Sequence, residues 1–245
     1  MTELIKTGTP GLDQVLKGGL RRNSCVLVTG APGTGKTLMV LQFVYYGAKD
    51  CNENGIFITT EESLEVLHQS GKNLGMDLQS MVDKGKIFIV QKPITTLKGG
   101  LASAKGLTDA IKKYNIKRVA LDSLIFFEYL YPRFNGNKLE FRRQVLMFME
   151  QMRKVGVTFL VVSERSVTDF DRLEYDMMDF VFEGIIMLSR IRKGSYFERV
   201  ITIAKMRGQD HSLDVYPLTI GPDGMKVLYD QTPFSLVEKE GNGFK

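Results

Sequence analysis

The sequence has few of the residues that form disulfide frameworks and protein-ligated metal sites. Its 245 residues include two cysteines and two histidines. Cys25 and Cys51 have neither metal-ligand spacing nor the density of a disulfide framework, and His68 and His211 lie far apart in the chain. The pattern therefore argues against a zinc site held by protein ligands and against a disulfide-stabilised fold.

Long apolar runs and targeting signals are also missing. No stretch approaches the ~18 consecutive apolar residues of a membrane span, and the opening MTELIKTGTPG lacks the basic-then-apolar pattern of a signal peptide. We therefore expect a cytoplasmic protein without a membrane partner. The net charge of +5 is spread over basic pairs such as Arg21-Arg22 and Lys112-Lys113. A solvated surface is the favoured interpretation, and a nucleic-acid track is the less favoured one.

Short apolar runs alternate with helical patterns over most of the chain. Continuous apolar strands are typical of a parallel sheet that is buried on both faces by helices. The runs predicted as strands are residues 24–29, 55–60, 86–90, 117–121 and 157–163. The stretches predicted as helices are residues 36–48, 63–74, 101–114 and 139–155. We expect an α/β fold with a mostly parallel central sheet flanked by helices.

The rhythm changes after residue 163. GIIMLSRI, RVITIAKM and LTIGPDGMKVLY are strand-like and have no helix-length insert between them, so they predict an antiparallel extension at the edge of the sheet. The chain shows no internal repeat and no Pro/Ser-rich linker. We expect one domain over residues 1–245, with a core of about residues 5–230 and a polar tail at 231–245.

The segment GAPGTGKT lies between an apolar run and a helical pattern, and it fits the spacing G-x-x-x-x-G-K-[ST]. Its glycines permit positive φ angles and close approach of a ligand, and the loop directs successive N–H groups toward an anion. The lysine can reach the β- and γ-phosphates, and the threonine hydroxyl can ligate Mg²⁺. A chance strand-to-helix turn is the alternative. The predicted nucleotide-binding residues are Gly30, Ala31, Pro32, Gly33, Thr34, Gly35, Lys36 and Thr37.

Acidic residues follow two of the predicted strands, at the edge where open α/β sheets bind their ligands. FITTEES places Glu61 and Glu62 after the second strand, where a carboxylate can position or deprotonate the attacking water. Capping of the next helix, with Ser63, is the alternative role. RVALDSL places Asp122 after another strand, where it matches a Walker B aspartate that holds Mg²⁺; a turn-forming Asp-Ser pair is the alternative.

Phosphoryl transfer also needs positive charge at the transition state, worth ~10³ to 10⁵ in rate when an arginine finger supplies it. The segment IAKMRGQDH offers Lys205, Arg207 and His211. Residues two apart on a strand point to the same side, so the first two cations can face one target. A solvated strand end is the ordinary alternative for such a segment.

Together these segments resemble a known family. TGTPGLDQVLKGGL, GAPGTGKT, TTEES, ALDSL, VVSER and KMRGQDH are similar to a single KaiC-type domain of the RecA superfamily of P-loop NTPases, over about residues 5–229. The combination of TG-x-x-GLD with K-M-R-G-x-x-H is its most specific part. Clock-type KaiC proteins carry two such domains and this sequence has one, so no circadian role follows.

The resemblance implies a ring, commonly a hexamer of identical subunits, with ATP or ADP at the boundary between subunits. It implies that Glu61 and Glu62 are paired catalytic glutamates and that Asp122 is the Walker B residue. Lys205 and Arg207 would reach the γ-phosphate of the neighbouring subunit, with His211 close by. The segment SERSVTD is more similar to the hydrolysing type of domain than to the autophosphorylating type, so Ser166 and Thr168 are weak phosphorylation candidates.

The sequence thus predicts a slow, Mg²⁺-dependent, ring-forming ATPase. The catalytic residues expected are Glu61, Glu62 and Lys36 of one subunit, with Lys205 and Arg207 of the next. A DNA-dependent recombinase-type ATPase, using residues 166–175 as a DNA-binding loop, is one alternative, although VTDFDRLEY is acidic for that role. A nucleotide-sensing scaffold that signals to a protein partner and turns over little is another.

Overall fold

A computed structural model describes residues 3–91, 104–127, 138–165, 177–234 and 236. Its centre is a nine-stranded sheet with the strand order β11-β10-β9-β8-β3-β7-β6-β4-β5. The strands from β8 to β5 in that order pair in parallel, and β9, β10 and β11 pair antiparallel. The bounds of these strands are β3 Cys25–Gly30, β4 Asn54–Thr59, β5 Ile87–Gln91, β6 Ile116–Asp122, β7 Thr158–Glu164, β8 Gly184–Lys193, β9 Tyr196–Met206, β10 Tyr216–Gly221 and β11 Gly224–Val227.

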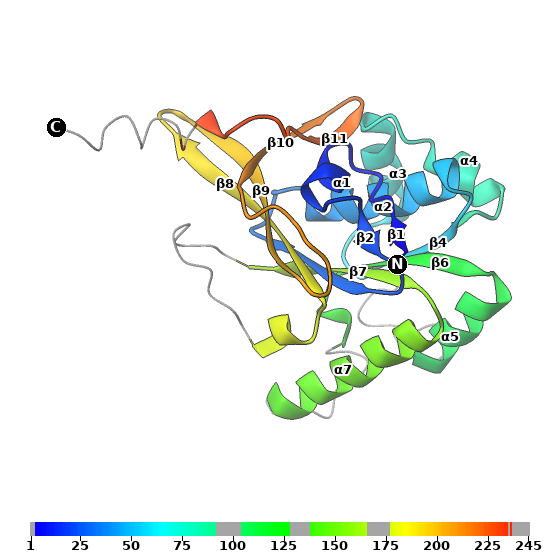
Figure 1. Ribbon diagram of the computed structural model, residues 1–245. Helices are drawn as coiled ribbons and strands as arrows, with labels where there is room; N and C mark the ends of the chain where they lie inside the picture. Colours follow the sequence, from blue (N-terminus) through cyan, green and yellow to red (C-terminus); the bar gives the residue numbers. More distant parts are fainter. Residues whose placement is uncertain (1–2, 92–103, 128–137, 166–176, 235, 237–245) are drawn as a thin grey trace.

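Helices cover the two faces of this sheet (Figure 1). One apolar core lies between the sheet and α1 to α4, and a second lies between the sheet and α5 and α7. The sheet therefore has a hydrophobic layer on each side, as the continuous apolar strands predict. The helix bounds are α1 Leu12–Val15, α2 Lys36–Asp50, α3 Leu64–Asn73, α4 Leu78–Asp83, α5 Ala104–Lys113 and α7 Lys138–Lys154; a 3₁₀ helix, η4, spans Met177–Phe180. Residues 101–103 of one predicted helix lie outside the described residues.

The mostly parallel sheet with an antiparallel extension is confirmed, with one difference at its junction. β8, expected in the extension, pairs in parallel with β3 and antiparallel with β9. The connection from Glu164 to Gly184 is longer than the dozen or so residues that a parallel crossover needs. β8 can therefore begin beside the start of β3 and run in the same direction. The antiparallel extension accordingly starts at β9.

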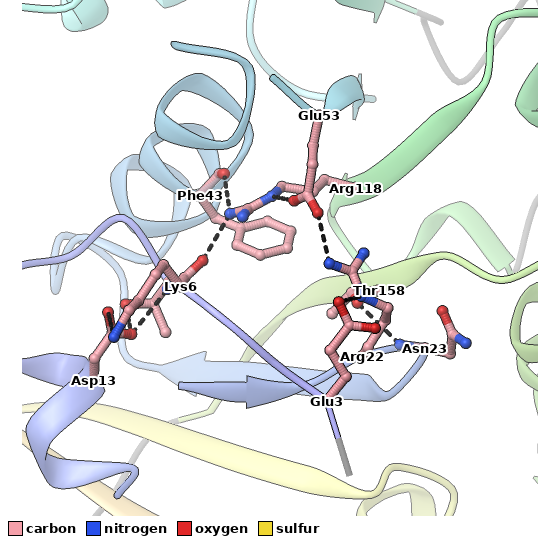
Figure 2. A network of polar contacts seen from close by, with 10 residues as sticks. Glu3, Lys6, Asp13, Arg22, Asn23, Phe43, Glu53, Arg118 and Thr158 are labelled. Carbon is pink, nitrogen blue, oxygen red and sulfur yellow. Dashed lines mark hydrogen bonds and ion pairs between the residues drawn. The ribbon is translucent and has the colours of Figure 1, made fainter. Parts of the chain in front are cut away.

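A buried arginine ties the N-terminal segment to the sheet and to α2 (Figure 2). Arg118 on β6 is 1% exposed; it bonds the Glu53 carboxylate at 2.6 Å and donates to the carbonyl oxygens of Lys6 at 2.8 Å and Phe43 at 3.1 Å. Glu53 also pairs with Arg22 at 2.9 Å. This network joins the segment at Lys6, the residue Glu53 just before β4, and α2, the helix that follows the predicted phosphate-binding motif.

A buried glutamine holds α2 from another direction. The Gln42 amide donates to the carbonyl oxygens of Gly8 at 2.9 Å and Met225 at 3.0 Å, and its oxygen accepts the Met225 N–H at 2.9 Å. Gln42 has no exposed surface. The N-terminal segment and β11 therefore both fix the position of α2, and α2 in turn positions the site at its N-terminus.

Candidate nucleotide and magnesium site

The loop between β3 and α2 has positive φ angles at its three glycines, a backbone conformation that other residues rarely adopt. Gly30, Gly33 and Gly35 have φ angles of 152°, 75° and 107°. A Cβ on Gly30 would lie 2.1 Å from the Leu188 carbonyl oxygen, and one on Gly35 would lie 2.7 Å from Met225 Cε. A side chain is therefore excluded at Gly30 by the backbone beside it, whereas at Gly35 the near atoms are the mobile tips of side chains and the positive φ is the main obstacle.

The N-terminus of α2 is available to an anion. Gly35 is the N-cap residue of this 15-residue helix, and no side chain caps it. The first N–H groups of a helix have no partner within the helix, and the helix dipole places partial positive charge there. The loop and helix together form the geometry that binds phosphate in the predicted motif.

Lys36 lies at the first position of α2 and folds back onto the loop. Its Nζ donates to the Ala31 carbonyl oxygen at 3.0 Å, and the side chain is buried. Burial lowers the pKa of Lys36, while the carboxylates of Glu164, Asp122 and Glu61 oppose that fall. The lysine is thus a cation held beside the loop and surrounded by acidic groups.

The predicted metal ligands touch each other. Thr37 Oγ1 donates to Asp122 Oδ2 at 2.6 Å, joining the start of α2 to the end of β6. Asp122 is 4% exposed. Burial raises the pKa of its carboxyl group; the bond from Thr37 acts in the opposite direction, and the Glu61 carboxylate raises the pKa further.

The two glutamates follow β4 at the same edge of the sheet. The Thr59 hydroxyl accepts the N–H groups of Glu61 at 3.3 Å and Glu62 at 3.1 Å, which bends the chain as it leaves the strand. Ser123 Oγ donates to Glu61 Oε1 at 3.1 Å. Ser63 caps α3 by accepting the Val66 N–H, so neither glutamate side chain has to serve as the N-cap.

Glu62 has a buried carboxylate oxygen, whereas the Glu61 carboxylate accepts a hydrogen bond from Ser123. The buried Glu62 oxygen, Oε2, has no hydrogen-bond partner among the described residues. Burial raises the pKa of Glu62, and the carboxylates of Asp122 and Glu61 raise it further. A buried acceptor of this kind is costly unless a ligand or ion satisfies it.

These groups line one cleft of about 440 Å³. Its acidic side chains outnumber the basic ones: Glu61, Glu62, Asp122 and Glu164 face Lys36 and Arg199. No group of three or more His, Cys, Asp or Glu side chains among the described residues is arranged to hold a metal alone. Mg²⁺ is usually held by one or two carboxylates together with substrate phosphates, so a hydroxyl and carboxylate beside a phosphate loop fit that ion.

Lys205 and Arg207 lie away from this cleft in their own chain. Gly30 pairs with Leu188 of β8, whereas Lys205 pairs with Ile185, nearer the start of β8. The Arg207 N–H donates to the carbonyl oxygen of Glu183, just before β8 begins, and the Arg207 side chain is exposed. The structure therefore does not bring these two cations to the phosphate loop of the same subunit.

The loop that carries His211 packs against the N-terminal motif. The Gln209 amide donates to the carbonyl oxygens of Leu16 and Gly19, each at 2.7 Å. A Cβ on Gly208 would lie 2.3 Å from Arg21 Nη1. The half-buried His211 contacts its own loop, with Nδ1 2.9 Å from the Ser212 carbonyl oxygen. The two most specific motifs in the sequence are thus two sides of one packed unit.

Comparison with known proteins identifies the family. The family model described as ATPase, KaiC, matches residues 5–232. The chain belongs to the KaiC family. It is 33% identical over 231 residues to the circadian clock oscillator protein KaiC of Picosynechococcus, covering 91% of this chain and 44% of that protein. It is 29% identical over 231 residues to the KaiC of Synechococcus elongatus, with the same two coverages. The chain therefore spans less than half the length of these curated relatives.

A solved structure supports the same assignment. The KaiC-like protein PH0186 of Pyrococcus horikoshii OT3 superimposes with a TM-score of 0.78 at 30% identity, covering 93% of this chain and 99% of that one. The RecA-like α/β fold and the assignment to an ATP-binding ATPase family are thereby confirmed. In the described part of this KaiC-family chain, no helix is long and apolar enough to cross a membrane.

Sequence reasoning missed two arginines beside the phosphate loop. Arg190 on β8 donates to the Pro32 carbonyl oxygen at 3.0 Å, and Arg199 on β9 lines the cleft. The two residues are direct cross-strand partners. In SRIRK and FERV, the alternation of side chains along a strand assigns each arginine to one face of the strand. Only the pairing of β8 with β3 and β9 places that face beside the loop.

Two predictions fall on residues outside the described ranges. The candidate phosphorylation sites Ser166 and Thr168 lie there, as does the proposed DNA-contacting segment 166–175. These predictions therefore stay untested.

Proposed function

We propose that this KaiC-family chain hydrolyses ATP slowly, with Mg²⁺, in a homo-oligomeric ring whose sites lie between subunits. One observation carries the proposal: the phosphate loop, the Thr37–Asp122 pair and Glu61 meet in one cleft, while the remaining expected cations lie elsewhere in the same chain. The match of one family model to residues 5–232 supports treating the chain as a single domain.

The loop residues bind and orient the polyphosphate. The N–H groups of residues 30–37 and the α2 N-terminus hold the phosphate oxygens, and Lys36 turns from the Ala31 carbonyl toward the β- and γ-phosphates. Thr37 and Asp122 would hold Mg²⁺, which supplies charge neutralisation for the transferring phosphoryl group when bound. Burial raises the pKa of the Asp122 carboxyl group, so a bound cation would stabilise its charged form.

The glutamates act on the attacking water. Glu61 faces the cleft with one carboxylate oxygen held by Ser123, which leaves the other oxygen for the water in line with the γ-phosphorus. Glu62, half-buried beside it, is the second member of the catalytic pair. Burial raises the pKa of Glu62, and repulsion from Asp122 and Glu61 raises it further; that repulsion falls once a cation enters the site.

The neighbouring subunit supplies positive charge in addition to that of Lys36 and Arg199. Arg207 is exposed just after the end of β9, and Lys205 lies two residues before it in β9, so a second copy can offer both to the γ-phosphate, with its His211 close by. A head-to-tail interface of this kind closes into a ring. The expected ring is a hexamer.

Hydrolysis measured against protein concentration tests the proposal. We expect specific activity with Mg·ATP to rise as rings form on a sizing column, and to fall when a chelator removes Mg²⁺. Glu61→Gln should abolish turnover and keep nucleotide binding, whereas Glu65→Gln, exposed on the first turn of α3, should change neither. Equal activity in dilute monomer would contradict a site shared between subunits, and bound ATP that is never cleaved would favour the nucleotide-sensing scaffold.

A further inference from the structure

The ammonium group of Lys205 is held by backbone carbonyls of its own subunit. Its Nζ donates to the carbonyl oxygen of Asp179 at 2.7 Å and to that of Phe182 at 2.6 Å. It also lies 5.9 Å from the centre of the Phe180 ring. An ammonium group has three donors, so these two bonds fix its position and, among the described residues, leave one donor for an acceptor on another subunit.

An ion pair fixes the residue that provides the first of these carbonyls. Arg165 Nη2 donates to Asp179 Oδ1 at 2.6 Å and also bonds Oδ2. The Asp179 side chain is 1% exposed and that of Arg165 is 20% exposed. Charge-assisted bonds in a buried setting are short and directional. Because the carboxylate and the carbonyl belong to one residue in the single turn of η4, the pair restricts the carbonyl that binds Lys205.

The other end of this connection is the phosphate loop. Arg165 follows Glu164, the last residue of β7, which lines the nucleotide cleft. The Arg165 N–H donates to the carbonyl oxygen of Gly30 at 3.1 Å. Continuous contacts therefore run from the phosphate loop through Arg165 and Asp179 to Lys205.

Resting on the function proposed above, we propose that Arg165 and Asp179 are positioning residues for Lys205 and link each subunit's own phosphate loop to the cation it presents to its neighbour. Loss of the pair frees the η4 carbonyl and misplaces the ammonium group. A displacement of about 1 Å at a reacting centre lowers the rate on the order of 10²-fold. Nucleotide binding to the phosphate loop does not depend on this link.

The charges around Lys205 agree with this role. Burial, followed by repulsion from Arg207, lowers the pKa of Lys205, and the carboxylates of Asp179 and Glu183 oppose that fall. Asp179 thus helps to keep the lysine charged as well as positioned. Asp179→Asn removes the charge and the ion pair while it retains the shape of the side chain and the backbone carbonyl.

Mixed rings separate a defect in the presented cation from a defect in the phosphate loop. Glu61→Gln subunits bind ATP but do not cleave it, and they present an intact Lys205. Mixed 1:1 with subunits damaged only in the presented cation, they form rings in which about one quarter of the interfaces combine intact halves. Lys205→Ala mixed with Glu61→Gln is the reference, and Asp179→Asn mixed with Glu61→Gln is the test.

We expect Asp179→Asn alone to lose roughly 10²-fold in kcat with unchanged binding of a fluorescent ATP analogue. We expect both mixtures to regain activity. Arg165→Gln, at the less buried end of the pair, should repeat the result if Asp179→Asn folds poorly. Asp109→Asn, an exposed carboxylate on α5, is the matched control and should retain full activity.

The possible failures differ from one another. If the reference mixture regains activity and the Asp179→Asn and Arg165→Gln mixtures do not, the positioning role is wrong and the shared site stands. Full activity of Asp179→Asn alone likewise overturns the positioning role. If the reference mixture itself regains nothing, the shared site is wrong and the link to the neighbour falls with it.

Discussion

Replacing Arg118 by alanine removes the centre of the buried network that anchors α2. The substitution deletes the 2.6 Å bond to Glu53, the bonds to the carbonyl oxygens of Lys6 and Phe43, and a guanidinium that lies 4.7 Å from the centre of the Phe43 ring. Removing one partner of a buried ion pair costs about 3–5 kcal/mol. Glu53 keeps Arg22 as a partner, so we expect the lower end of that range.

Thermal and urea unfolding monitored by circular dichroism provide the assay. A loss of ~3 kcal/mol in a domain of this size corresponds to a fall of roughly 6–12 °C in the unfolding midpoint. Arg143→Ala is the matched control, because Arg143 is 67% exposed and pairs with Glu140 only at 3.4 Å. Exposed pairs contribute about 0–1 kcal/mol, so this variant should unfold within ~4 °C of the wild type. Arg118→Lys, which keeps the charge but loses the planar fork, should lie between the two. Equal midpoints for Arg118→Ala and Arg143→Ala would refute the structural role assigned to the network.

Three further predictions concern the thiols, the metal carboxylate and the phosphate loop. Burial raises the pKa of the Cys25 thiol, whereas Cys51 is exposed. Ellman's reagent should therefore label one thiol in the native protein and both in denaturant. Labelling of both thiols before unfolding would contradict the burial of Cys25. Folding raises the pKa of Asp122, so the folded protein binds the proton of this carboxyl group more tightly than the unfolded chain does. The free energy of unfolding of the nucleotide-free protein should therefore fall as pH rises from the ordinary carboxyl pKa through the raised one. Asp122→Asn should therefore raise the unfolding midpoint at pH 7 and abolish Mg-dependent hydrolysis; an unchanged or lower midpoint would contradict this. Gly35→Ala should bind a fluorescent ATP analogue ~10-fold more weakly, because an L-residue at its φ of 107° is strained by roughly 1–2 kcal/mol. Gly221→Ala, whose φ lies outside the left-handed region and whose Cβ would have nothing within 4 Å, should bind normally. Equal binding by the two variants would overturn the conformational reasoning.

Local patterns were sufficient to predict most of the parallel sheet and the composition of the cleft. Continuous apolar strands followed by polar residues place Glu61 and Asp122 at one edge, and the phosphate-binding motif itself specifies Lys36 and Thr37. These inferences succeed because they depend on chain direction and spacing alone. The catalytic roles of these residues stay predictions.

The elements that were missed depend on short segments or on distant partners. The helix α4 has six residues, too few for a periodic pattern, and begins at an Asp77 cap. Arg190 and Arg199 reach the phosphate loop only because β8 joins the parallel strands. The contact between Arg165 and Asp179 follows from the return of the chain to the start of β8, which no local pattern encodes.

The central claim is that one subunit's cleft is completed by cations from the next. The most direct measurement is ATP hydrolysis by a 1:1 mixture of Glu61→Gln and Arg207→Ala subunits, each inactive alone. The shared site predicts recovery approaching one quarter of wild-type activity, because about that fraction of random head-to-tail interfaces pairs an intact Glu61 with an intact Arg207. A mixture that stays as inactive as its components, while still forming mixed rings that bind ATP, would contradict it.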